Sequence, residues 1–186
     1  MNTSKKTVVV ALILGLGATA FLMPSCSKSS SPARQTLYDS LGGTTMVADP
    51  ANAGTMIEKG RLGLRSVVDS AIYVIAGDAN INGFFTVLLT EVTAGNTSGF
   101  SALSKNLTDF FCVATGAKNF SYTGKSMHDA HNPATNSRMN GLAASDDFDS
   151  FVADVVTAAK KVGVSTQLIG QVGTVIYSVE AQVVQK

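Results

Sequence analysis

The chain has 186 residues, of which 45% are hydrophobic and 15% are charged, and its formal net charge is +1. This length and apolar content fit one globular domain, and they argue against a disordered chain or two full domains. The sequence has neither a basic stripe nor an internal repeat, so nucleic acid is not an expected partner.

The first 25 residues have the pattern of an export signal. Lys5 and Lys6 give a charged start, and residues 7–22 form an uninterrupted run of apolar or small residues. A permanent membrane helix needs about 20 apolar residues, so the run is short for an anchor, which stays the alternative. The charged start, apolar middle and small-residue end favour a cleaved signal peptide over residues 1–25.

Two cleavage sites compete at the end of this signal. The run Met-Pro-Ser-Cys that ends at Cys26 resembles a bacterial lipobox, although a leucine is usual in place of its methionine. Ala18 and Ala20 instead offer the small side chains that an ordinary signal peptidase needs. Residues 26–35 fit the flexible tether of a lipoprotein, which favours a lipid on Cys26. We expect an exported protein, lipid-anchored at the periplasmic face of the cell envelope, with a soluble periplasmic or secreted form as the alternative.

Apolar residues recur at steps of three and four in four later segments, which predicts four substantial helices and an all-α fold. The segments are residues 61–76, residues 101–115, a stretch from Ser145 or Asp146 to near Gly163, and a last helix capped by Ser165 that runs to Val183. Cys112 falls on an apolar helix face and is expected to be a small buried residue. A Cys26–Cys112 disulfide becomes possible only if the signal is cut after Ala20.

Two segments contain small and turn-forming residues in place of a helical pattern. They are residues 44–60 and residues 132–138, the second of which includes Pro133 and Arg138. Pro133 must end any helix that precedes it. Both segments are predicted to be surface insertions, which cost little when the ends of a loop are held.

Five short motifs occur in a fixed order from residue 36 onward. They read Thr-Leu-Tyr-Asp-Ser-Leu-Gly-Gly at 36–43, Asn-Gly-Phe-Phe at 82–85, Asp-Phe-Phe at 109–111 with Thr-Gly-Ala at 115–117, Tyr-Thr-Gly-Lys-Ser-Met-His-Asp-Ala-His at 122–131, and Asp-Phe-Asp-Ser-Phe-Val at 147–152. In this order they resemble the group 1 truncated haemoglobins, a bacterial-type globin family, although Ala117 replaces a hinge glycine. The resemblance implies a truncated globin domain over residues 36–186, a two-over-two helical sandwich.

The resemblance also implies a haem site in which His131 is the proximal ligand of the iron. A neutral imidazole nitrogen binds haem iron well, and its other nitrogen is normally held by a backbone carbonyl. The cofactor would be haem b, with the opposite face of the iron open to O2, NO or CO. His128 is expected in solvent or near a haem propionate, and Arg138 is either near a propionate or a solvated loop arginine. The other implied haem contacts are Phe84, Phe85, Leu103, Leu107, Phe110, Tyr122, Met127, Tyr73 and Ile72.

The sequence departs most from the family on the side opposite His131. Globins that hold O2 tightly aim a hydrogen-bond donor at it, because O2 draws negative charge from the iron. Counting along the helices from the phenylalanine pairs places Ile72, Leu103 and Leu107 there, and all three are apolar. A slip of one residue would bring Tyr73 or Asn106 inward, and the sequence leaves both arrangements open.

The expected function is reversible binding of a diatomic gas at haem iron. The alternative on the same cofactor is NO dioxygenase or peroxidase-like chemistry, which needs an electron donor from outside the chain. Alternatives of other classes are a haemless helical envelope lipoprotein that acts as an interaction module, and a carrier that passes haem on. The substitution His131→Ala separates these readings, because only a haem protein would lose its pigment.

Overall fold

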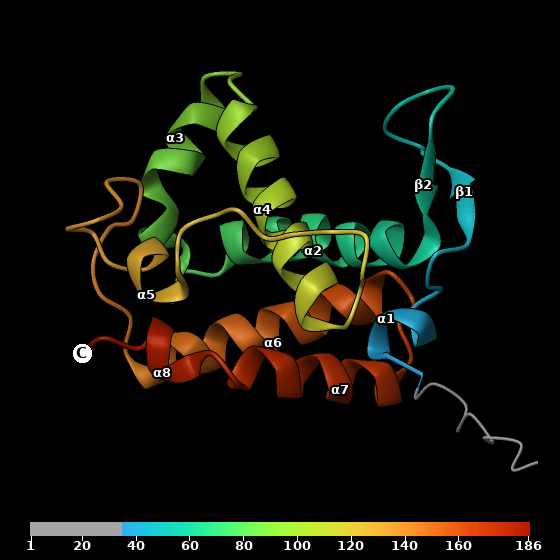
Figure 1. The fold of residues 1–186 in the computed structure, drawn as a ribbon. Coiled ribbons are helices and arrows are strands. Elements are labelled where there is room, and N and C mark those ends of the chain that lie inside the picture. The colour runs from blue at the N-terminus through green and yellow to red at the C-terminus, as the bar shows by residue number, and fades with distance from the viewer. Residues whose placement is uncertain (1–34) are drawn as a thin grey trace, which may run out of the picture. The chain divides into compact units, whose positions relative to one another are not determined.

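The computed structural model describes residues 35–186. The predicted signal peptide, the two cleavage sites and Cys26 lie outside the described residues. The elements in chain order are α1 (Leu37–Ser40), β1 (Met46–Ala48), β2 (Met56–Glu58), α2 (Lys59–Gly77), the 3-10 helix η1 (Asn82–Phe85), α3 (Thr86–Thr93), α4 (Ser98–Ala114), α5 (Met127–Ala130), α6 (Ser145–Lys161), α7 (Thr166–Tyr177) and α8 (Glu180–Val183). The predicted all-α class is confirmed, since helices form most of this part of the chain (Figure 1).

The short helix α1 is fixed at both ends by its own sequence. At its start, the Thr36 hydroxyl accepts from the Asp39 backbone N–H (3.1 Å), and the Asp39 carboxylate accepts from the Thr36 N–H (2.9 Å). At its end, Gly42 and Gly43 have φ values of +120° and +56°, which residues with a side chain rarely adopt. The glycine pair of the first motif therefore ends the first helix through backbone angles that other residues resist.

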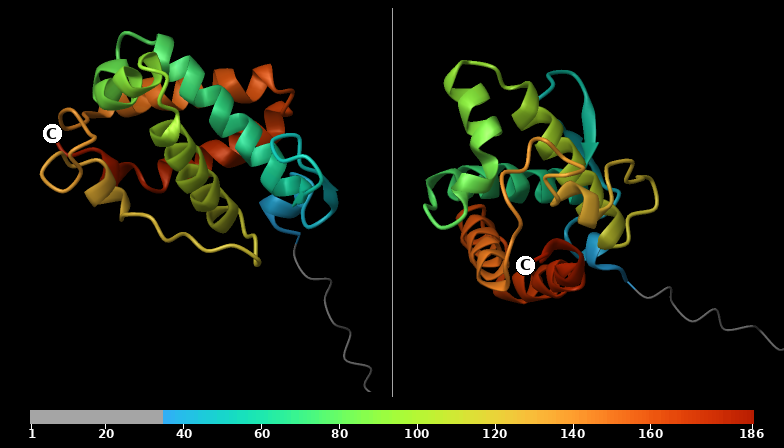
Figure 2. Two further views of the ribbon diagram at one scale, coloured as in Figure 1. Left: turned by 90° about the horizontal axis from the view of Figure 1, so that it is seen from above. Right: turned by 90° about the vertical axis from the view of Figure 1, so that its left-hand side faces the viewer.

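Helix α2 lies at the centre of the fold and packs most extensively against α6 and α4. Its buried apolar residues recur at helical spacing and face both neighbours; they are Leu64, Val67, Val68, Ala71, Ile72 and Ile75. Figure 2 shows α2 and α4 on one side and α6 beside α7 on the other. The predicted pairing of the four long helices into two layers is thus confirmed.

The last predicted helix is in fact two. Helix α7 ends at Tyr177 and α8 begins at Glu180. The Ser178 hydroxyl donates to the Val175 carbonyl (2.6 Å), and the Val179 N–H bonds the Ile176 carbonyl at 3.1 Å instead of continuing the α-helical pattern. A serine side chain that competes for a helix carbonyl in this way interrupts the helix.

Residues 44–60, predicted as a surface loop, contain an ordered hairpin. Strands β1 and β2 pair antiparallel with Val47 opposite Ile57. The Asp49 carboxylate accepts from the Ala51 N–H (2.9 Å) and forms an ion pair with Arg65 of α2 (2.6 Å). The strands are three residues long, too short for an alternating pattern to reveal them in the sequence.

Within residues 35–186 no single helix is both long and apolar enough to cross a membrane. The segments Lys59–Gly77 and Asn82–Thr93 meet that test of length and composition only when taken together, and they are bent by 109° relative to each other.

Candidate functional site

His131 stands at the end of α5, a helix of four residues whose limits follow from its sequence. The Ser126 hydroxyl accepts from the Asp129 backbone N–H (3.1 Å) and begins the helix as its N-cap. Pro133 cannot donate a backbone hydrogen bond, and it disfavours helical backbone angles in the residue before it. The helix therefore ends with His131 as its C-cap.

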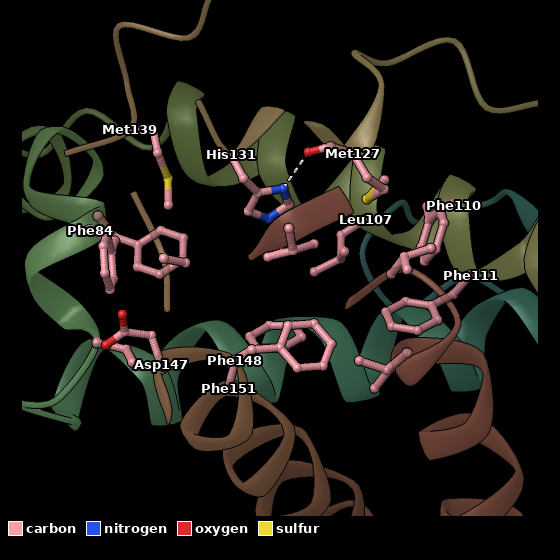
Figure 3. Close-up of a pocket in the computed structure, with 16 residues that line it drawn as sticks. Phe84, Leu107, Phe110, Phe111, Met127, His131, Met139, Asp147, Phe148 and Phe151 are labelled. Carbon is pink, nitrogen blue, oxygen red and sulfur yellow. Dashed lines mark hydrogen bonds between the residues drawn. The ribbon is translucent and has the colours of Figure 1, made fainter. Parts of the chain in front are cut away.

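The hydrogen bond of the His131 ring defines which nitrogen is free. Its Nδ1 lies 2.7 Å from the carbonyl oxygen of Met127. Because a carbonyl only accepts, Nδ1 carries the hydrogen, and in the neutral ring the lone pair is on Nε2. Burial lowers the pKa of His131 below its ordinary value, although the bond to Met127 opposes the shift. At neutral pH the ring is therefore uncharged, and it points into a cavity (Figure 3).

All four carbonyl groups of α5 accept a hydrogen bond from a side chain. The donor and acceptor pairs are His131 Nδ1 to Met127 (2.7 Å), Gln185 Nε2 to His128 (2.9 Å), Thr135 Oγ1 to Asp129 (2.9 Å) and Asn136 Nδ2 to Ala130 (2.6 Å). The Met127 and His128 carbonyl groups also accept the backbone N–H of His131, whereas Thr135 and Asn136 bond the two carbonyl groups that have no partner within the helix. Residues 132–138, predicted only as a surface insertion, therefore help to hold the helix that carries His131.

One cavity lies between α5 and the helices α6 to α8, and we call it the α6 cavity. Its volume is about 670 Å³, including its opening to solvent. It is lined by Ile81, Phe84, Phe85, Leu107, Phe110, Phe111, Met127, His131, Met139, Ala143, Asp147, Phe148, Phe151, Ile176, Val179 and Val183. In the described part of the chain, only His131 and Asp147 give this wall a polar side chain. In Figure 3 Phe148 and Phe151 lie across the cavity from the His131 ring.

A second cavity, which we call the α4 cavity, adjoins the first. Its volume is about 1000 Å³, again including its opening. It is lined by Ile72, Ile75, Phe85, Leu88, Gly99, Leu103, Asn106, Leu107, Phe110, Tyr122, Met127, Ala130, His131, Asn136, Arg138, Met139 and Phe151. His131 belongs to both linings and stands where the cavities meet.

The structure brings the residues predicted for the site together, with one exception. Those that line one or both cavities are His131, Phe84, Phe85, Leu103, Leu107, Phe110, Tyr122, Met127 and Ile72. The exception is Tyr73, which is 71% exposed and packs on Phe100 with ring centroids 5.6 Å apart.

The arrangement in which a helix slip turns Tyr73 inward is therefore wrong. Neighbouring residues point about 100° apart around a helix, so only one of the pair can face the cavity. Ile72 is 7% exposed and shares the buried face of α2 with Val68 and Ile75. Asn106 lines the edge of the α4 cavity but remains exposed to solvent.

The contribution of α6, α7 and α8 to the cavity wall was not predicted from the sequence. Phe148 and Phe151 belong to the motif at residues 147–152, and their spacing of three residues places them on one face of α6. Ile176 and Val179 come from either side of the unpredicted break between α7 and α8. Neither α7 nor α8 contains any of the five motifs.

The polar residues near α5 have partners of their own. His128 is exposed, as predicted, and its Nδ1 lies 3.4 Å from the Asp129 carboxylate. Arg138 donates from both terminal nitrogens to the Glu91 carboxylate of α3, at 2.8 and 2.6 Å. It is therefore an ion-paired residue at the edge of the α4 cavity, not a freely solvated one. Cys112 is fully buried, as predicted.

Comparison with known proteins identifies the fold. No protein-family model matches the chain, and no curated protein matches its sequence. The structure is similar to the truncated haemoglobin from Tetrahymena pyriformis in its Fe(III) form, with a TM-score of 0.57 and 22% identity over 82% of this chain and 100% of that chain. Single-residue variants of the same haemoglobin give the same values. The chain thus has the truncated-globin fold that its motifs predicted.

Proposed function

We propose that this protein is a haem-binding globin of the group 1 truncated type, in which His131 would ligate the iron and the iron would take a diatomic gas. The observation that carries the proposal is the hydrogen bond from His131 Nδ1 to the Met127 carbonyl. It leaves an unprotonated Nε2 inside an apolar cavity, which is the state that haem iron requires of a histidine ligand. A carbonyl acceptor behind a ligating imidazole also fixes the ring orientation and raises the basicity of the ligand.

The cavity residues fit a haem group. Haem is a flat, largely apolar ring with two carboxylate side chains, so its site must combine apolar walls with polar groups at an edge. Phe84, Phe85 and Phe110 supply aromatic faces to the walls. Arg138, which is paired with Glu91, lies at the edge of the α4 cavity, where a carboxylate of the haem would meet solvent and a guanidinium group.

Each part of the site has a distinct task in this proposal. When bound, haem b supplies an iron centre that takes O2, NO or CO. His131 would hold that centre, and the side chains around Phe148 and Phe151 would exclude water from it. The side chains that bond the carbonyl groups of α5 keep the His131 ring in place. The similarity to a truncated haemoglobin studied in its Fe(III) form supports the same reading.

Export is a second element of the proposal, and it is supported by the sequence alone. The signal pattern of residues 1–25 and the lipobox-like run at Cys26 favour a globin held on the cell envelope by an N-terminal lipid.

The test of haem binding is the visible absorption spectrum of the purified chain, supplied with haem, in ferric, ferrous and CO-bound forms. We expect a Soret band that shifts with CO and is lost in His131→Ala. His128→Ala is the matched control, because His128 lies on the same helix but is 58% exposed, and it should keep the spectrum. Absence of a Soret band in the wild type after haem titration would overturn the proposal, as would an unchanged spectrum in a folded His131→Ala protein.

A further inference from the structure

The helices α2 and α4 give the α4 cavity an apolar wall. Ile72 and Ile75 come from α2 and are 7% and 5% exposed, while Leu103 and Leu107 come from α4 and are half-buried. None of these four side chains can donate a hydrogen bond. Tyr73, the only tyrosine of α2, is turned to solvent on the other side of the helix.

The donors that do line this cavity are engaged elsewhere. The Tyr122 hydroxyl donates to the Lys125 carbonyl (2.6 Å), and the Asn136 amide donates to the Ala130 carbonyl (2.6 Å). Both terminal nitrogens of Arg138 donate to Glu91. Withdrawing the Asn136 amide would leave a carbonyl of α5 without its partner, which costs about 1–3 kcal/mol where that group is buried.

Asn106 is the remaining polar side chain of the wall. It stands on α4 one residue before Leu107, so its side chain leaves the helix about 100° away from that of Leu107. It is exposed, whereas Leu103 and Leu107 are half-buried. Its amide therefore belongs to the solvent edge of the cavity.

We propose that the cavity favours CO over O2, because within residues 35–186 the one lining donor not engaged elsewhere, Asn106, lies at the solvent edge and away from the bound gas. This inference rests on the proposed haem function. O2 draws negative charge onto itself when it binds ferrous iron and gains from a nearby donor, whereas CO remains almost uncharged. A hydrogen bond to a charged acceptor changes an equilibrium by about 10- to 100-fold, and we expect the affinity for O2 to be lower by that factor than in a cavity with a donor.

The test restores a donor and measures both gases. Dissociation constants for O2 and CO are determined for the wild type, for Ile72→Tyr and for Leu103→Gln, and the C–O stretching frequency of each CO complex is recorded by infrared spectroscopy. Leu103→Gln is included because it changes volume little at a half-buried position, whereas a tyrosine at residue 72 must fit a packed face. We expect either substitution to strengthen O2 binding about 10- to 100-fold, to alter CO affinity little and to lower the C–O frequency.

Two further variants show whether the wild type already uses a donor. Tyr73→Phe and Asn106→Leu each remove one polar group and should leave both dissociation constants and the C–O frequency unchanged. A fall in O2 affinity of about tenfold or more in either variant would overturn the inference while leaving the haem function intact. A wild-type protein without a Soret band would instead overturn the proposed function itself, so the two failures are distinct.

Discussion

The Nδ1 atom of His131 and the backbone N–H of the same residue both bond the carbonyl oxygen of Met127, at 2.7 and 3.3 Å. One acceptor thus fixes the backbone and the ring of His131 together. The free Nε2 is oriented by the main chain of a single helical turn, not by a second titratable side chain. Burial keeps the ring neutral, and the bond to the Met127 carbonyl aims it into the cavity without a carboxylate beside it.

The first prediction concerns the dependence of stability on pH. Burial lowers the pKa of His131 in the folded protein below its ordinary value of 6.5. Below pH 6.5 the unfolded chain therefore binds more protons at this residue than the folded chain, and acid favours unfolding. We expect the free energy of unfolding of the haem-free protein to fall more steeply from pH 7 to 5 in the wild type than in His131→Gln, as measured by chemical denaturation. Parallel curves for the two proteins would contradict this assignment.

The second prediction concerns the loop that holds α5. Asn136→Ala removes the donor to the Ala130 carbonyl and should destabilise the fold by about 1 kcal/mol, which lowers the melting temperature by about 2–4 °C. Under the proposed function it should also speed the transfer of haem to apomyoglobin, because His131 follows Ala130 directly. Ser137→Ala, an exposed change in the same loop, is the control and should alter neither quantity.

The third prediction compares two cations that share one carboxylate. Asp109 is 6% exposed, and it lies 2.7 Å from both Arg61 and Lys105. Arg61 is itself largely buried and also lies 4.5 Å from the centre of the Phe120 ring, whereas the Lys105 side chain is 63% exposed. We expect Arg61→Ala to cost about 3 kcal/mol of unfolding free energy, because it leaves a buried charge poorly compensated.

The matched change Lys105→Ala should cost no more than about 1 kcal/mol, as is usual for an exposed ion pair. Denaturation of both variants with urea measures the difference. Equal losses of unfolding free energy in the two proteins would show that the burial of Arg61 does not increase the cost of removing it.

The fourth prediction concerns the N-terminus. Cells that express the full chain and receive an alkyne-labelled fatty acid should yield a labelled, membrane-bound protein, and Cys26→Ser should abolish both the label and the membrane fraction. An unlabelled wild-type protein that begins at Phe21 would instead show that cleavage follows Ala20, the ordinary signal-peptidase site.

The sequence by itself determined the features that depend on residues close together in the chain. The limits of α6 were predictable from the acids in its first turn and from Gly163, whose φ is +82°. The turn at Gly42 and Gly43, and the short helix between Ser126 and Pro133, follow from capping and from backbone angles in the same way. Local hydrogen bonds and steric limits determine such elements regardless of what packs against them in the folded protein.

Only the tertiary structure decided what lines the cavity. Whether Ile72 or Tyr73 faces inward depends on how α2 is rotated about its axis between α4 and α6. The backbone hydrogen bonds within the helix are the same in either rotation. The approach of α6, α7 and α8 to His131 likewise depends on contacts between residues far apart in the chain. The free energy gained by burying apolar surface depends on the area buried and not on how far apart the residues are in the sequence. The periodicity therefore predicted the helices, whereas their packing determined which faces are buried.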